Sequence, residues 1–68
     1  MPILRMSEIR KMSREEKVRR LNELRTELIR LRVMAKRGML DDPGRLREIR
    51  RTIARILTVL REEELKIR

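Results

Sequence analysis

Two long segments of the chain share one spacing of apolar residues, and a short break separates them. In each segment apolar residues recur at steps of three and four, which is the spacing of one face of an α-helix. The first set is Leu21, Leu24, Leu28, Leu31 and Ala35. The second set is Leu46, Ile49, Ile53, Ile56 and Leu60. Two matching apolar stripes predict two helices that pack along their length, like an antiparallel coiled coil.

Capping residues mark the ends of the first helix. Ser13 and Glu16 have the spacing of a capping box, in which side chains satisfy free amides at the start of a helix. Gly38 can take the left-handed conformation that often follows the last helical turn. The first helix is therefore expected over residues 14–37.

The second helix has its own start signal. Asp42 can accept hydrogen bonds from the first turn, and Pro43 fits there because first-turn amides have no partner within the helix. Nothing breaks the pattern after Pro43, so the second helix is expected over residues 43–67, after a loop at 38–42. Because the loop is short, the two helices should be antiparallel neighbours.

The N-terminal segment adds one smaller element. Ser7 can cap a short helical turn, which is expected over residues 7–12. The expected fold class is therefore all-α: an antiparallel two-helix hairpin with a short N-terminal helical turn. A chain of 68 residues has room for one small domain, so residues 1–68 are expected to form a single helical-hairpin domain.

The chain is strongly basic, and this limits its partners. Lysine and arginine total 20 against 11 aspartates and glutamates, which gives a formal net charge of +9. A surplus of this size indicates a polyanionic partner, either nucleic acid or an acidic membrane surface. The chain has no aromatic residue, so it cannot stack bases on aromatic rings. Binding to nucleic acid would use phosphates, grooves and shape.

Several function classes are disfavoured by residues that the chain lacks. Without cysteine or histidine it has no usual zinc ligand, no thiol nucleophile and no imidazole base, so we expect no enzyme, no catalytic residue, no cofactor and no small-molecule substrate. The acidic run Glu62–Glu64 is not expected to hold a metal, because consecutive carboxylates on a helix point in different directions and usually meet water. With no apolar run of about 18 residues and no apolar signal-peptide core in Met1–Met6, a soluble, unexported protein is expected.

The second helix carries arginines on the side opposite its apolar stripe. At about 100° per residue, five arginines fall within an arc of about 140°. Between Pro43 and Arg61 there are six arginines and a single acid, Glu48. A guanidinium group can form two hydrogen bonds to one phosphate, and the small Ala54 and Thr58 in the middle of the arc would let an RNA backbone approach closely. The predicted RNA-binding residues are Arg32, Lys36, Arg45, Arg47, Arg50, Arg51, Ala54, Arg55, Thr58 and Arg61.

The same arginines would also suit a solvated surface without a partner. Charge runs on helices are commonly solvated, but such surfaces normally mix both signs. The near absence of acids therefore favours anion binding.

Residues Asp42–Glu62 resemble the second helix of the universal uL29 family of large-subunit ribosomal proteins, in which a pattern close to N-P-x-R-I-R-x-I-R-R-x-I-A-R-I-x-T is characteristic. Ser7–Ser13 is similar to the family's opening, and Leu28–Arg32 followed by Gly38 is similar to the end of its first helix. The resemblance extends from about Met6 to Glu62.

The resemblance implies a structural constituent of the large ribosomal subunit, cytoplasmic and ribosome-bound, on large-subunit rRNA near the polypeptide exit tunnel. Neighbouring ribosomal proteins at the tunnel exit would be further partners, and no membrane would be involved. Two departures stand out: Leu57 occupies a position that is basic in many relatives, and Asp41-Asp42 replaces the more usual acid and asparagine before proline. The family's basic positions correspond to Arg45, Arg47, Arg50, Arg51 and Arg55.

Three other interpretations fit parts of the pattern. A free coiled-coil interaction module could self-associate into a helical bundle, although the arginine-rich face argues against it. An enzyme similar to small helical chorismate mutases would need a third helix to close its pocket. A membrane-surface helix is disfavoured because the two apolar stripes match each other and the chain lacks Trp and Phe.

Overall fold

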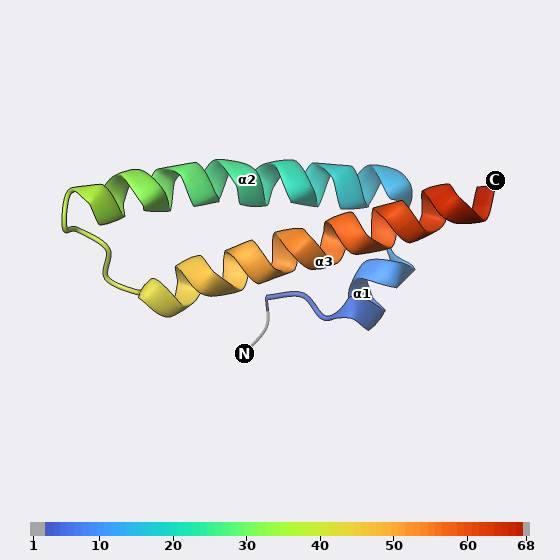
Figure 1. The fold of residues 1–68 in the computed structure, drawn as a ribbon, viewed down its shortest axis with the longest axis horizontal. Helices are drawn as coiled ribbons and strands as arrows, with labels where there is room; N and C mark the ends of the chain where they lie inside the picture. Colours follow the sequence, from blue (N-terminus) through green and yellow to red (C-terminus); the bar gives the residue numbers. More distant parts are fainter. Residues whose placement is uncertain (1–2, 68) are drawn as a thin grey trace.

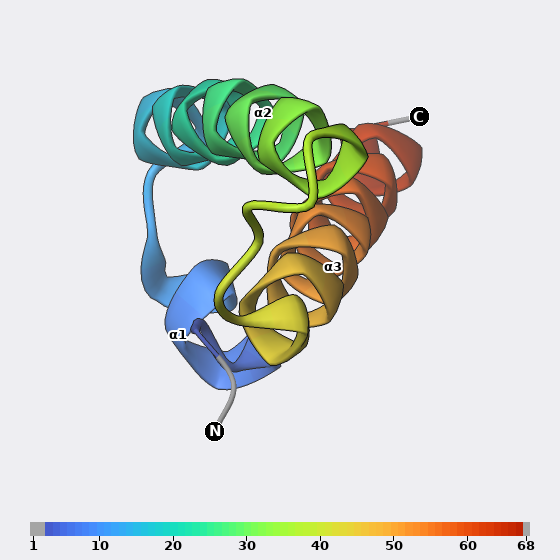
Figure 2. The same cartoon turned by 90° about the vertical axis from the view of Figure 1, so that its left-hand side faces the viewer.

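The computed structural model describes residues 3–67 and places three helices in that range. Helix α1 covers Met6–Lys11, α2 covers Arg14–Lys36 and α3 covers Pro43–Ile67 (Figure 1). Helices α2 and α3 lie side by side in opposite directions, and α1 packs against another side of α3 (Figure 2). The predicted fold class is confirmed: the fold is all-α, with two long paired helices and a short N-terminal helix, and no strand within the described range.

Ser13 begins helix α2 as predicted. Its backbone is extended, with φ −66° and ψ 161°, and its hydroxyl accepts a hydrogen bond from the Glu16 amide at 3.1 Å. The reciprocal bond of a capping box, from the Ser13 amide to the Glu16 carboxylate, is not formed in the described part of the chain. One side-chain bond at this position is enough to satisfy an amide that has no partner within the helix.

Helix α2 ends at Lys36, one residue earlier than expected. The amides of Gly38 and Met39 donate back to the carbonyls of Ala35 at 3.1 Å and Met34 at 2.9 Å. This pair of bonds is a Schellman motif, which requires a left-handed residue. Gly38 has φ +70°, a conformation that glycine adopts without a Cβ clash, so the predicted role of this glycine is confirmed.

The start of helix α3 also follows the prediction. The Asp42 carboxylate accepts a hydrogen bond from the Arg45 amide at 3.2 Å, and Pro43 takes the first helical position. The connection between the long helices therefore covers residues 37–42.

The prediction for the N-terminal turn is wrong in its start and its cap. Helix α1 begins at Met6, not after Ser7, and it ends at Lys11, where the expected turn was 7–12. The cap residue is Arg5, whose amide donates to the Glu8 carboxylate at 3.4 Å. Because a carboxylate in the first turn already serves the free amide and favours the positive end of the helix, Ser7 is not needed as a cap.

The buried arc of the α3 surface is wider than the arc of its predicted apolar stripe. Ile49 and Ile56 are fully buried, as expected, but so are Thr52 and Val59, which belong to no predicted stripe. On the helical wheel these two residues extend the buried arc by about 60°. The N-terminal part of the chain packs against α3 as well, because α1 contacts α3 and both Leu4 and Ile9 are buried in the same core.

One predicted core position is wrong: Ala35 is exposed. Its side chain is a single methyl group, the shortest in the stripe, and it lies in the last turn of α2, where the connection of residues 37–42 follows. Met34 and Leu40, both partly buried against the core, pack at this end instead. The other stripe residues are buried or partly buried in one cluster.

Candidate nucleic-acid interface

The side of α3 turned away from both other helices is polar and exposed. We call this surface the outer face of α3 and define it as Arg47, Arg50, Arg51, Ala54, Thr58 and Arg61, all of which are exposed. Ile49, Thr52 and Ile56 are fully buried on the opposite side, where α3 packs on the other two helices, and this burial fixes the rotation of α3 about its own axis. The outer face is therefore presented on a rigid element, because the opposite side of the helix is the core.

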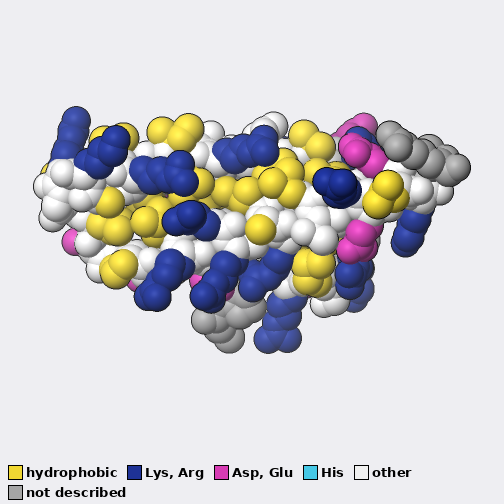
Figure 3. All heavy atoms as spheres, viewed as in Figure 1, with side chains coloured by type: hydrophobic (Ala, Val, Ile, Leu, Met, Phe, Trp, Pro, Cys, Tyr) yellow, Lys and Arg dark blue, Asp and Glu magenta, His cyan; other side chains and the backbone are white. Residues whose placement is uncertain are grey.

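Basic side chains extend beyond α3. Figure 3 shows Lys and Arg side chains over both α2 and α3 on one face of the molecule, with hydrophobic side chains between the two helices. Asp and Glu side chains show mainly near the end that carries the C-terminus. A surface dominated by one sign of charge attracts oppositely charged polymers over a distance of about 8–10 Å at moderate salt.

Arg32 and Lys36 lie on the α2 part of this face. On the helical wheel they fall on the same side of α2 as Arg14, within about 40°. Arg14 reaches across to Glu64 of α3 at 3.5 Å, which identifies this side of the helix pair as the one bordered by Arg50. The structure thus places Arg32 and Lys36, both exposed, beside the outer face of α3.

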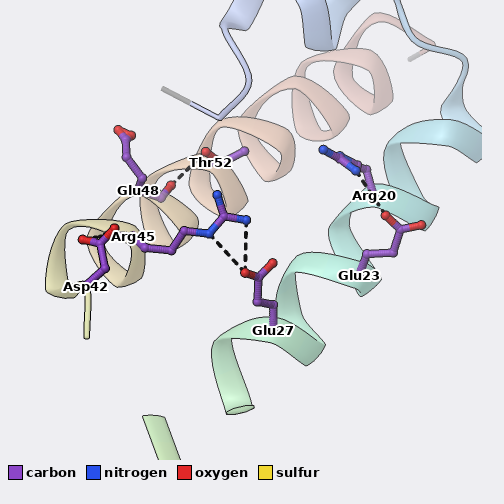
Figure 4. A network of polar contacts seen from close by, with 7 residues as sticks. All are labelled: Arg20, Glu23, Glu27, Asp42, Arg45, Glu48 and Thr52. Atoms are coloured by element: carbon purple, nitrogen blue, oxygen red, sulfur yellow. Dashed lines mark hydrogen bonds and ion pairs between the residues drawn. The ribbon is translucent and has the colours of Figure 1, made fainter. Parts of the chain in front are cut away.

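Arg45 has a different environment from the outer face. Its Nε and Nη2 atoms donate to Glu27 Oε1 of α2 at 3.2 and 3.1 Å (Figure 4). The Glu27 side chain is 26% exposed and that of Arg45 is 47% exposed. The guanidinium group of Arg45 therefore fastens α3 to α2.

Arg55 also faces a carboxylate. Its Nη1 atom lies 3.9 Å from Glu48 Oε2, two turns earlier on the same helix. The two side chains are 28% and 20% exposed, and these two atoms are buried without a hydrogen-bond partner in the described structure. At this distance the contact is an ion pair without a hydrogen bond, so it orients the guanidinium group but leaves its hydrogen-bonding capacity unused.

The acidic run near the end of α3 does more than meet water, so that expectation is wrong. Its three consecutive carboxylates point in three directions, as predicted, but each direction leads to a basic side chain on α1 or α2. The ion pairs are Glu62–Arg10 (3.5 Å), Glu63–Lys17 and Glu64–Arg14 (3.5 Å). We call these three pairs the acidic clasp. Sequence reasoning missed it because the paired residues are 46 to 52 positions apart in the chain, far beyond the range of local helix patterns.

Within residues 3–67, no group of acidic, histidine or cysteine side chains could hold a metal ion. No described helix combines the length and apolar character needed to cross a membrane.

The fold and its charged surface define a small, strongly basic helical-hairpin protein. Comparison with known families then makes the assignment specific, because the family described as ribosomal L29 protein matches residues 7–62. The chain therefore belongs to the ribosomal L29 family, whose members are non-enzymatic structural proteins of the large ribosomal subunit. The resemblance carried by Asp42–Glu62 is confirmed.

Individual relatives match over nearly the whole chain. The large ribosomal subunit protein uL29 of Staphylothermus marinus is 59% identical over 64 residues, which are 94% of this chain and 96% of the relative. The protein of the same name from Pyrobaculum aerophilum is 52% identical over 63 residues, 93% of this chain and 84% of the relative. That from Caldanaerobacter subterraneus is 49% identical over 65 residues, 96% and 98% of the two chains.

Proposed function

We propose that this chain is a ribosome-bound component that binds large-subunit rRNA through the outer face of α3. The observation that carries the proposal is the contrast in ion pairing. Arg47, Arg50, Arg51 and Arg61 are exposed, and none of them has a carboxylate partner within residues 3–67. Their positive charge is therefore available to phosphates.

The distribution of acids supports this proposal. Most acidic side chains of the described chain are engaged elsewhere: Glu27 and Glu48 pair with Arg45 and Arg55, and the acidic clasp takes three more. Asp42 is used as a helix cap. On the outer face of α3 no described carboxylate neutralises the arginines, and release of counterions from RNA phosphates would drive binding there.

The other predicted site residues would contribute to RNA binding to different extents. Arg32 and Lys36 supply a second line of positive charge from α2, beside the outer face. Arg45 and Arg55 contact RNA only by sharing their guanidinium groups with Glu27 and Glu48, so their contribution is smaller. Ala54 and Thr58 leave a low surface between arginines, against which a sugar-phosphate backbone can lie.

The position near the polypeptide exit tunnel, with contacts to ribosomal proteins there, belongs to the same proposal. It is supported by the uL29 resemblance and by an exposed apolar side chain at the loop end of the hairpin. Met39 in the loop is 59% exposed. Apolar side chains at such exposure suit contact with a protein neighbour better than contact with phosphates.

A comparison of two triple variants tests the RNA-binding face. Arg47→Ala/Arg50→Ala/Arg51→Ala removes three charges from the outer face. Arg19→Ala/Arg30→Ala/Arg37→Ala removes three exposed charges from outside that face, two on α2 and one on the residue directly after it. Binding to deproteinised large-subunit rRNA is measured by filter retention at several salt concentrations. The outer-face variant should lose affinity on the order of 100-fold, and its log-log salt slope should become shallower by about 2 to 3.

The control variant should lose much less affinity, because only its general charge is changed. Equal losses in the two variants would mean that net charge, and not the outer face, governs binding. Sedimentation of the unsubstituted chain as a dimer or larger assembly, without rRNA binding, would instead favour the self-associating interaction module.

A further inference from the structure

Thr58 lies in the middle of the outer face of α3 and is exposed. Arg51 precedes it by two turns and Arg61 follows it by one, at about 10 and 5 Å along the helix axis. Ala54, one turn before Thr58, is also exposed and carries only a methyl group. A nucleic-acid backbone held by the flanking arginines would therefore pass directly over the Thr58 side chain.

The hydroxyl of Thr58 has a defined direction. Its Oγ1 atom lies 2.9 Å from the carbonyl oxygen of Ala54, at hydrogen-bond distance. A carbonyl oxygen can only accept, so the hydroxyl must donate its single hydrogen to the helix backbone. What Thr58 presents to the outside is a lone pair, which is an acceptor and not a donor.

This direction restricts what Thr58 can bind. Phosphate oxygens of a nucleic-acid backbone are acceptors, so they form no hydrogen bond with an oxygen that has already donated its hydrogen. The ribose 2′-hydroxyl is a donor, and in an RNA helix it lines the wide, shallow minor groove where a protein surface can reach it. DNA has no donor at this position.

We propose that Thr58 accepts a hydrogen bond from a ribose 2′-hydroxyl of the bound RNA and so makes the outer face selective for RNA over other polyanions. This inference rests on the RNA-binding function proposed above and adds its specificity-determining residue. The arginines attract any phosphate backbone, because their interaction depends on charge alone. Thr58 would distinguish RNA from DNA, because its hydrogen bond requires a 2′-hydroxyl on the sugar.

A second threonine provides a matched control. Thr26 of α2 is exposed and donates its hydroxyl to the Asn22 carbonyl at 3.0 Å, in the same geometry as Thr58. It lies on the side of α2 turned away from α3, outside the outer face. Replacing either threonine by valine keeps the branched shape and removes the hydroxyl oxygen.

The test uses two chemically synthesised copies of the rRNA fragment that the chain protects, one all-ribose and one with 2′-fluoro sugars. A 2′-fluoro group keeps the A-form shape but has no hydroxyl hydrogen to donate. Thr58→Val should bind the ribose copy about 2- to 10-fold more weakly than the unsubstituted chain, and both should bind the fluoro copy equally. Thr58→Ser should restore the preference for ribose, and Thr26→Val should behave like the unsubstituted chain.

Three results would overturn the inference. If Thr58→Val weakens binding to both copies by the same factor, the hydroxyl donates to phosphate instead. If Thr58→Val binds the ribose copy as tightly as the unsubstituted chain, Thr58 makes no such contact. If the unsubstituted chain binds no rRNA fragment at all, the proposed function fails together with the inference, whereas the first two results leave RNA binding intact.

Discussion

Helix α3 carries arginines on two of its sides, and their neighbours differ. Arg45 and Arg55 border the side that packs on the other helices, and each faces a glutamate. Arg47, Arg50 and Arg51 lie on the outer face, where no described carboxylate pairs with them. The comparison teaches that the placement of the acids, and not of the arginines, decides which positive charges hold the fold and which remain available to a partner.

The largest expected difference between the two sides is in stability, and adjacent residues can show it. Ile56 is fully buried, whereas Leu57 is 42% exposed. Ile56→Ala should lower the free energy of unfolding by about 2–5 kcal/mol, because it removes buried methyl groups and leaves a cavity. Leu57→Ala should cost less than about 1 kcal/mol. Urea unfolding followed by circular dichroism measures both values, and similar losses would mean that α3 has no distinct inner side.

A smaller effect is expected from the acidic clasp, where one partner is buried. Lys17 is only 3% exposed, so removal of Glu63 leaves an ammonium group without its partner. Glu63→Ala should lower the free energy of unfolding by about 1–3 kcal/mol, with Glu63 itself being partly solvated. Lys17→Met should cost less, because it removes the buried charge and keeps the apolar stem.

The control for that pair is Glu62→Ala. Its partner Arg10 is 55% exposed, so the loss should stay below about 1 kcal/mol. The same urea titration measures all three variants. A loss for Lys17→Met that exceeds the loss for Glu63→Ala would show that the charge of Lys17 stabilises the fold by a route other than Glu63.

The smallest expected effect follows from removing the carboxylate partner of Arg45, which would leave its guanidinium group free to bind phosphate. Glu27→Gln removes the partner of Arg45 and should change the free energy of unfolding by less than about 1 kcal/mol, because both side chains are partly exposed. Affinity for rRNA should rise about two- to threefold as Arg45 becomes available. Glu15→Gln makes the same charge change on an exposed residue of α2. Equal increases for the two variants in filter binding would mean that only net charge is being measured.

The ends of the long helices were predictable from sequence because capping is local. The bond from the Glu16 amide to Ser13 and the left-handed Gly38 both depend on residues within five positions of each other. The prediction of Ser7 as the cap of α1 was wrong because two residues close together in the sequence, Arg5 and Ser7, could both precede a helical turn. Arg5 and Glu8 form the cap that the fold uses.

The width of the core was not predictable in the same way. Thr52 is polar, and a polar residue outside an apolar stripe is normally expected at the surface. It is nevertheless fully buried, and its hydroxyl is satisfied there because it donates to the Glu48 carbonyl at 2.8 Å. The prediction for Ala35 was wrong for a different reason: its spacing fits the stripe, but the longer side chains of Met34 and Leu40 pack against the core near the loop end instead.

The residues of the candidate site also differ in how far the sequence could place them. That Arg47, Arg50 and Arg51 lie opposite the apolar stripe follows from helix geometry alone, since side chains project at about 100° per residue. That Arg45 meets Glu27 depends on how far α2 is shifted along α3, which no local pattern specifies.

The sequence by itself determined the two long helices, the positions of their ends to within one residue, their antiparallel pairing and the side on which most arginines of α3 lie. These features depend on side-chain periodicity and on bonds between residues a few positions apart. The tertiary structure alone decided that α1 covers a second side of α3, that Glu62–Glu64 clasp two other helices, and that Arg45 faces Glu27. Such contacts join residues many positions apart, so they exist only once packing has set the distance and register of the helices.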